Sequence, residues 1–182
     1  LAYDSPGIGA DGLRTNDDFN GFNGSPDRYN WKLVGKKEMY VAYNNYKLTS
    51  KALKYKDIIQ TNHVNPDLLR YELHRVWVVE ATLKPGARHI YSKRVFYIDE
   101  DSWAVLHADQ YDARGGLWRV REVYGVQLYD APAFGPAGEV IYDLQARRYL
   151  VNALTNEEKP VEFGKKYTTA DFSTAALRRM GR

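Results

Sequence analysis

From Arg75 onward the chain alternates between strand-type runs and turn clusters. The runs are rich in Val, Tyr, Trp and Ile, and the turns follow one another at roughly ten to fifteen residues. This spacing leaves almost no room for crossover helices, so neighbouring strands must join as antiparallel hairpins. The sequence therefore predicts a mainly β fold, with a single antiparallel sheet of at least six strands between about Trp31 and Ala153 and few helices. The turn clusters are 84–87, 99–102, 112–116 and 130–132.

The chain of 182 residues is long enough for one good core and too short for two ordinary domains. Residues 1–30 are rich in Gly, Asp, Asn and Pro without periodicity, which predicts an irregular N-terminal arm. Residues 31–160 are expected to form the antiparallel β domain, and residues 161–182 a C-terminal tail with a short helix capped by Ser173. Asn65 and Pro66 predict the start of another short helix.

The amino-acid composition excludes several kinds of site and binding partner. The chain contains no cysteine, which excludes disulfides and thiolate metal sites. The net charge of +3 is scattered, whereas a nucleic-acid interface would need clustered Lys and Arg. No apolar run is long enough to span a membrane. Because the chain begins at Leu1 and not at Met, we expect that a signal peptide or a larger N-terminal portion precedes it.

The best-defined hairpin surrounds Asp112. A type I turn with Gly115 in the left-handed conformation would pair Tyr111 with Leu117. In that register Asp109 faces Arg119 and His107 faces Arg121 on a solvent-exposed side. The opposite side would be apolar except for Glu122, a carboxylate that must lie at a rim or meet a cation. The apolar side is predicted to carry Leu106, Ala108, Trp118, Val120 and Tyr124.

The hairpin from Arg75 to Ile98 has two apolar faces, so both must be covered. We place Trp77, Val79, Ala81, Leu83, Val95 and Tyr97 on one face, and Val76, Val78, Ile90, Phe96 and Ile98 on the other. The second cover could be the arm, a missing segment, a partner or a bound ligand; alternatively, the strands are simply sandwiched within the domain. If the apolar faces enclose a cavity, its predicted lining is Trp77, Val79, Tyr97, Trp118, Val120 and Tyr124.

Catalytic patterns are scarce. The four histidines show no HExxH or other close metal-ligand spacing, and no serine lies in a GxSxG elbow. The segment Gly7 to Ala10 neither follows a strand nor begins a helix, so it does not predict a nucleotide loop. We therefore expect no catalytic residues, no metal and no cofactor, and the chain is interpreted as non-enzymatic.

Four segments together resemble a bacterial family of uncharacterised exported domains, grouped with the outer-membrane lipoprotein-sorting proteins, the periplasmic carrier and its outer-membrane receptor. The resemblance covers nearly the whole chain. The segments are NGSPDRYNWKLVGKKE (23–38), RYELHRVWVVE (70–80), KRVFYIDEDSW (93–103) and DQYDARG (109–115).

The resemblance implies a curved, incomplete barrel with short helices on its concave side, exported to the periplasm. Association with the outer membrane is a further expectation from the resemblance. It further implies a hydrophobic small molecule or lipid as ligand. Family members are longer, and the end from Leu177 to Arg182 resembles their C-terminus, so the missing portion is expected at the N-terminus. An alternative function is a structural or adaptor subunit that docks a protein partner, such as an envelope transport protein.

Overall fold

The computed structural model describes residues 2–7, 9–159 and 161–181; Leu1, Ile8, Pro160 and Arg182, which include bounds of the expected segments, lie outside the described residues. Seven strands form one antiparallel sheet in which each strand pairs with its neighbours in sequence. The mainly β prediction is confirmed. The strands are β1 (Tyr29–Ala42), β2 (Tyr71–Leu83), β3 (Lys93–Asp99), β4 (Val105–Tyr111), β5 (Leu117–Leu128), β6 (Ala133–Asp143) and β7 (Arg148–Asn152).

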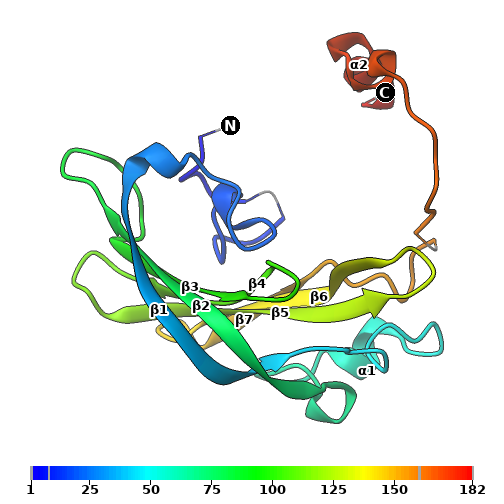
Figure 1. Ribbon diagram of the computed structural model, residues 1–182, viewed down its shortest axis with the longest axis horizontal. Coiled ribbons are helices and arrows are strands. Elements are labelled where there is room, and N and C mark those ends of the chain that lie inside the picture. The colour runs from blue at the N-terminus through cyan, green and yellow to red at the C-terminus, as the bar shows by residue number, and fades with distance from the viewer. Residues whose placement is uncertain (1, 8, 160, 182) are drawn as a thin grey trace.

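The sheet is curved and is covered on both sides (Figure 1). The arm, residues 2–28, lies on one side and contains the 3-10 turns η1 (Asn16–Asp18) and η2 (Pro26–Arg28). The connector, residues 43–70, lies on the other side and contains α1 (Tyr55–Ile58) and η3 (Pro66–Leu68). We call the two sides of the sheet the arm face and the connector face.

The connector covers one half of its face with a small apolar core. Leu48, Ile58 and Val64 are buried against Tyr124 and Val140 of the sheet. Such burial contributes about 1.5–3 kcal/mol for each large aliphatic side chain. The Asn65 side chain accepts a hydrogen bond from the Asp67 amide at 3.1 Å, which confirms the predicted cap of the short helical turn.

The turn around Asp112 has the predicted geometry. Gly115 has a φ of +80°, and Tyr111 pairs with Leu117. The Asp112 carboxylate holds the turn closed by accepting hydrogen bonds from the amides of Arg114 and Gly116, each at 2.9 Å.

Beyond this turn the predicted register is wrong. The register shifts between Gln110 and Tyr111, because Trp118 is an extra residue on β5 without a partner opposite. Asp109 therefore faces Val120, and His107 faces Glu122. A one-residue slip moves every following side chain to the other face of the sheet. Arg119 and Arg121, predicted on a solvent-exposed side, are buried on the arm face.

The predicted division of the β2–β3 hairpin is also wrong. Val79 pairs with Phe96 and Val78 with Tyr97, so Phe96 lies with Val79 on the arm face and Tyr97 lies on the connector face. The connecting loop, residues 84–92, sets this register. Both faces are nevertheless covered, as expected: Phe22 of the arm packs on Phe96, and the other face joins a cluster of buried side chains. That cluster contains Val41, Tyr43, Val76 and Leu106.

The C-terminal tail leaves the sheet after β7 and carries η4 (Thr169–Phe172) and α2 (Thr174–Met180), which stand apart from the sheet (Figure 1). The Ser173 hydroxyl accepts a hydrogen bond from the Ala176 amide at 3.2 Å, so the predicted cap is confirmed. Within the described residues, no helix has the length and apolar character needed to cross a membrane.

Candidate ligand-binding site

The arm is attached to the sheet by buried charges. Asp17 Oδ1 lies 2.7 Å from Nη2 of Arg94 on β3, and Arg94 is fully buried. Asp18 accepts hydrogen bonds from the Tyr91 hydroxyl at 2.9 Å and from the Gln110 amide at 2.5 Å. Because buried ions are costly without partners, these contacts fix where the arm can lie.

A local turn aims the two carboxylates at the sheet. Thr15 precedes η1, and its hydroxyl donates to Asp17 or Asp18, with oxygen distances of 2.6 and 2.9 Å. The Thr15 amide donates to Asp18 at 2.8 Å. Burial raises the pKa of Asp17, but hydrogen bonds from His89 and Arg94, together with the Arg94 charge, outweigh burial and lower the pKa to about 2.

Two further arginines continue this polar layer across β5. Arg119 lies 3.2 Å from Asp143 and donates to the Gly12 carbonyl of the arm at 2.7 Å. Arg121 is fully buried and forms an ion pair with Glu139. Its Nε and Nη1 atoms have no hydrogen-bond partner among the described residues. Buried donors of this kind bind ordered water in most proteins.

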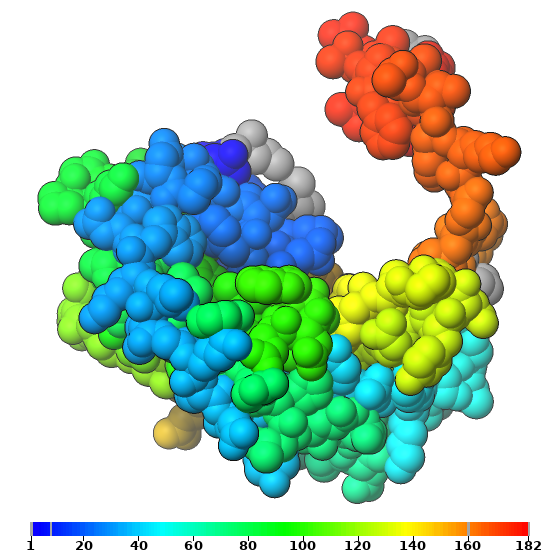
Figure 2. Space-filling model, in the orientation of Figure 1, coloured from blue at the N-terminus to red at the C-terminus, as the bar shows by residue number. Residues whose placement is uncertain are grey.

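Beside the end of this polar layer lies an open cleft of about 390 Å³. Three parts of the chain surround it: the arm, the β3–β4 turn and the β5–β6 hairpin. In Figure 2 the blue arm lies directly above the green segment, and the yellow segment lies beside the green one. The lining is mainly apolar and consists of Asn20, Phe22, Trp103, Ala104, Val105, Val123, Phe134, Gly135, Pro136 and Glu139.

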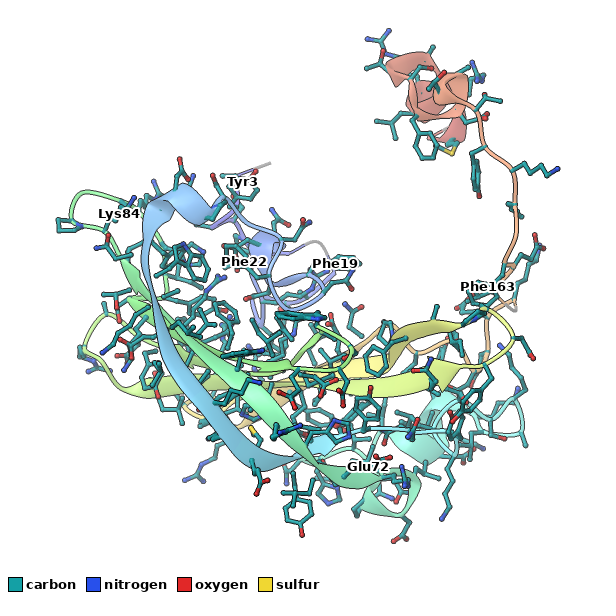
Figure 3. The ribbon with its side chains drawn as sticks, in the orientation of Figure 1. Tyr3, Phe19, Phe22, Glu72, Lys84 and Phe163 are labelled. Atoms are coloured by element: carbon teal, nitrogen blue, oxygen red, sulfur yellow. The ribbon has the colours of Figure 1, made fainter. Side chains whose placement is uncertain are left out.

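Glycines shape two walls of the cleft. A Cβ at Gly21 would lie 2.6 Å from Cβ of Val105, so only glycine lets the arm approach β4 this closely. A Cβ at Gly125 would overlap the Phe134 ring, so the ring can pack here only because residue 125 has no side chain. Figure 3 shows Phe22 on the part of the arm that faces the sheet. The cleft therefore depends on close packing between segments far apart in sequence.

Glu139, the charged residue of the lining, already has protein partners for its carboxylate. Glu139 is bound by Arg121 on one oxygen and by the Asn152 amide on the other at 2.9 Å.

Trp103 is 70% exposed at the rim of the cleft and has a φ of +58°, which is unusual for a bulky side chain. Unusual backbone conformations cluster at binding sites, where the surrounding structure holds them.

The structure does not bring the six predicted lining residues together. Trp77 and Val79 lie on the arm face, where Lys36 covers the Trp77 ring at 4.2 Å. Trp118 contacts Tyr91 beneath the arm. The remaining three, Tyr97, Val120 and Tyr124, lie on the connector face, and Tyr124 is fully buried there.

None of those six is among the side chains that line the cleft. Alternation along β5 places Val123 on the same side as Arg119 and Arg121, but only the bulge at Trp118 shows that this side is the arm face. Phe22 and Trp103 lie in irregular segments, so periodicity could not place them.

One group of side chains could hold a metal ion. Among the described residues, His74, Asp99 and Asp101 place one ligand atom each within 4.8 Å of one another. None of the three lines the apolar cleft. No sequence motif indicates this group, because His74 lies on β2, whereas Asp99 ends β3 and Asp101 lies in the turn beyond it.

Comparisons with known proteins agree with the fold. The chain is 54% identical over 182 residues to an uncharacterised protein of Pseudomonas aeruginosa, and it spans only 40% of that relative's length. A solved domain from Vibrio parahaemolyticus, named for outer-membrane lipoprotein sorting, matches with a TM-score of 0.55 at 14% identity, over 97% of this chain and 58% of that one.

A second solved structure, from Desulfovibrio piger, matches with a TM-score of 0.52 at 15% identity, over 91% of this chain and 53% of that chain. It carries the name of the same family that this sequence matches over residues 1–178. The resemblance inferred from the four sequence segments is thereby confirmed. The chain belongs to the family described as proteins of unknown function, DUF1329.

Proposed function

We propose that this domain binds an apolar ligand, a lipid or acyl chain, without catalysing a reaction on it, in the bacterial periplasm. The cleft between the arm and the sheet is the observation that carries the proposal. Its volume of about 390 Å³ falls within the range of known small-molecule sites, which are concave and mainly apolar. The name of the Vibrio parahaemolyticus domain supports the periplasmic setting and the lipid class.

The lining suits burial of hydrocarbon. Phe22, Val105, Val123 and Phe134 approach from four different segments and present apolar atoms to the cleft. Burial contributes about 25 cal/mol per Å² of apolar surface, so covering several hundred Å² supports about micromolar affinity after the costs of association. Both Glu139 oxygens are already bound by protein groups, which favours a structural role for this carboxylate over a role as a general acid or base.

The test is titration of the purified domain with a fluorescent fatty acid, comparing the wild type with Val123→Glu and Trp103→Ser. Both variants should bind at least about tenfold more weakly, because each removes apolar lining. Val120→Glu is the matched control, since Val120 lies on the connector face, and it should bind as the wild type does. Trp103 is exposed, so Trp103→Ser keeps the test decisive if Val123→Glu fails to fold. Absence of binding by the wild type would reject the proposal.

A second candidate, docking of a protein partner, is favoured by the exposed apolar side chains near the free edge of the sheet. β1 has no partner on its outer side within the described residues, and such edges can pair with another chain. A wild type that binds no fatty acid would shift support to this adaptor function. The exposed side chains are Trp31, Leu33, Val34 and Tyr40 on β1 and Tyr71 and Leu73 on β2.

A further inference from the structure

Three metal-ligating side chains meet where β2 runs past the end of β3. The last paired residues of these strands are Val76 and Asp99, so His74 stands beside the turn that follows β3. His74 Nδ1 lies 2.8 Å from Asp99 Oδ1, and one oxygen of Asp101 completes a set within 4.8 Å. An imidazole with two carboxylates is a donor set that suits first-row divalent transition metals.

The Asp99 carboxylate is held in position by the turn. Asp99 is fully buried, and its Oδ2 atom accepts hydrogen bonds from the amide and hydroxyl of Ser102 at 2.8 and 2.6 Å. Those bonds leave Oδ1 directed at His74. The carboxylate is therefore oriented before any ligand arrives.

His74 is oriented by an outer carboxylate. Its Nε2 atom lies 3.3 Å from Glu72, while Glu72 also accepts a hydrogen bond from Asn44 at 2.7 Å and pairs with Arg70. Tyr43 packs on the imidazole with ring centroids 4.2 Å apart. A carboxylate on the second ring nitrogen is the usual support of a metal-bound histidine, because it fixes the tautomer and the ring orientation.

A cavity of about 250 Å³ opens onto this group. His74 and Asp101 line it, together with Glu38, Leu73, Arg75 and Glu100. A simple hydrogen bond would account for the short distance between His74 and Asp99. It would not account for the nearby carboxylate of Asp101, which is exposed at the cavity. The cavity leaves room for water or an exogenous ligand in the remaining coordination positions. Figure 3 shows Glu72 at the lower edge of the sheet, away from Phe22 and the apolar cleft.

We propose that His74, Asp99 and Asp101 form a site for one divalent first-row transition metal ion, with Zn²⁺ as the probe. The site is independent of lipid binding, since none of its three ligands lines the apolar cleft. Glu100 is not a ligand, because Lys36 and Arg75 each bind its carboxylate at 2.5 Å.

The test measures Zn²⁺ affinity of the tag-free chain by competition with a chromophoric chelator. The wild type should bind one ion, and His74→Gln and Asp101→Asn should each weaken binding by at least about tenfold. Glu100→Gln is the matched control: it removes the same charge as Asp101→Asn from the adjacent residue and should retain wild-type affinity. Mg²⁺ in excess should compete poorly, because it prefers oxygen ligands.

Three results would overturn the proposal. The first is no Zn²⁺ binding by the wild type at about tenfold molar excess. The second is wild-type affinity in Asp101→Asn, a substitution at an exposed turn position that remains decisive if His74→Gln fails to fold. The third is equal loss in Glu100→Gln and Asp101→Asn, which would show that negative charge alone attracts the ion.

Discussion

Asp17 of the arm and Arg94 of β3 form an ion pair of 2.7 Å in which both side chains are buried. The pair joins residues 77 positions apart in sequence. It lies in the contact that keeps the arm on the sheet, and the apolar cleft begins where that contact ends. Removing one partner leaves a buried charge without compensation, which is far more damaging than the loss of an exposed pair.

Asp17→Ala should therefore lower the free energy of unfolding by about 3–5 kcal/mol. Asp4→Ala is the control within the same arm, because Asp4 pairs with Arg88, whose side chain is 93% exposed, at 3.2 Å. That exposed pair is worth less than about 1 kcal/mol. Urea unfolding measures both changes, and equal losses in the two variants would contradict the assignment of Asp17 as the anchor.

The same carboxylate predicts a loss of stability in acid. The pKa of Asp17 is about 2 in the folded chain, against an ordinary value of 3.8. The group therefore stabilises the fold above about pH 4 and loses that contribution as the pH falls toward 2. Unfolding free energies measured across this window should fall more steeply in the wild type than in Asp17→Asn. Parallel curves for the two proteins would show that another group governs acid sensitivity.

Glu122 should behave in the opposite way. Burial raises the pKa of Glu122 above its ordinary value of 4.5, and the charge of His107 and the hydrogen bond with Tyr71 only partly oppose burial. The folded state therefore binds the proton more tightly, and stability falls as the pH rises through the folded pKa.

Glu122→Gln should raise the melting temperature at pH 8, and the gain should vanish below about pH 4.5. Glu80→Gln, at a partly exposed carboxylate 3.9 Å from Lys93, should change stability by less than about 0.5 kcal/mol. A Glu122→Gln protein that melts below the wild type at pH 8 would mean that the charged carboxylate is stabilising.

Gly115→Val should cost about 1 kcal/mol or more, because a β-branched residue resists the φ of +80° at this turn. Gly116→Ala provides the neighbouring control, since its added Cβ would meet the nearest atoms of Asp112 at an ordinary 3.5 Å. Chemical denaturation should therefore separate the two variants. Equal midpoints would indicate that the turn tolerates a left-handed valine.

The amino-acid sequence predicts the structure correctly where the structure is determined by residues close together in the chain. The Gly115 turn, the Asn65 cap and the Ser173 cap each depend on hydrogen bonds or backbone conformations within a few residues. The antiparallel order of β2 to β7 follows from the same information, because each of these strands is joined to the next by a short connection.

The site could not be predicted in the same way. The extra residue at Trp118 reverses the faces of β5, and alternation alone cannot reveal such a bulge. From the sequence alone, Arg119 is expected at the surface. Its burial depends on contacts with Gly12 and Asp143, which lie far from it in the sequence. The lining of the cleft likewise depends on the arm, whose position is set by partners distant in sequence.

The order of the strands has a consequence for how the chain reaches its native state. From β2 to β7 every strand pairs with its sequence neighbour across a short loop, so this part of the sheet can grow one hairpin at a time without waiting for distant residues. The contacts of the arm are much less local: Asp18 binds Gln110, 92 positions away, and Gly12 binds Arg119, 107 positions away. A chain made from its N-terminus onward therefore cannot complete these contacts until β4 and β5 exist, so the arm takes its final position late and the cleft forms with it.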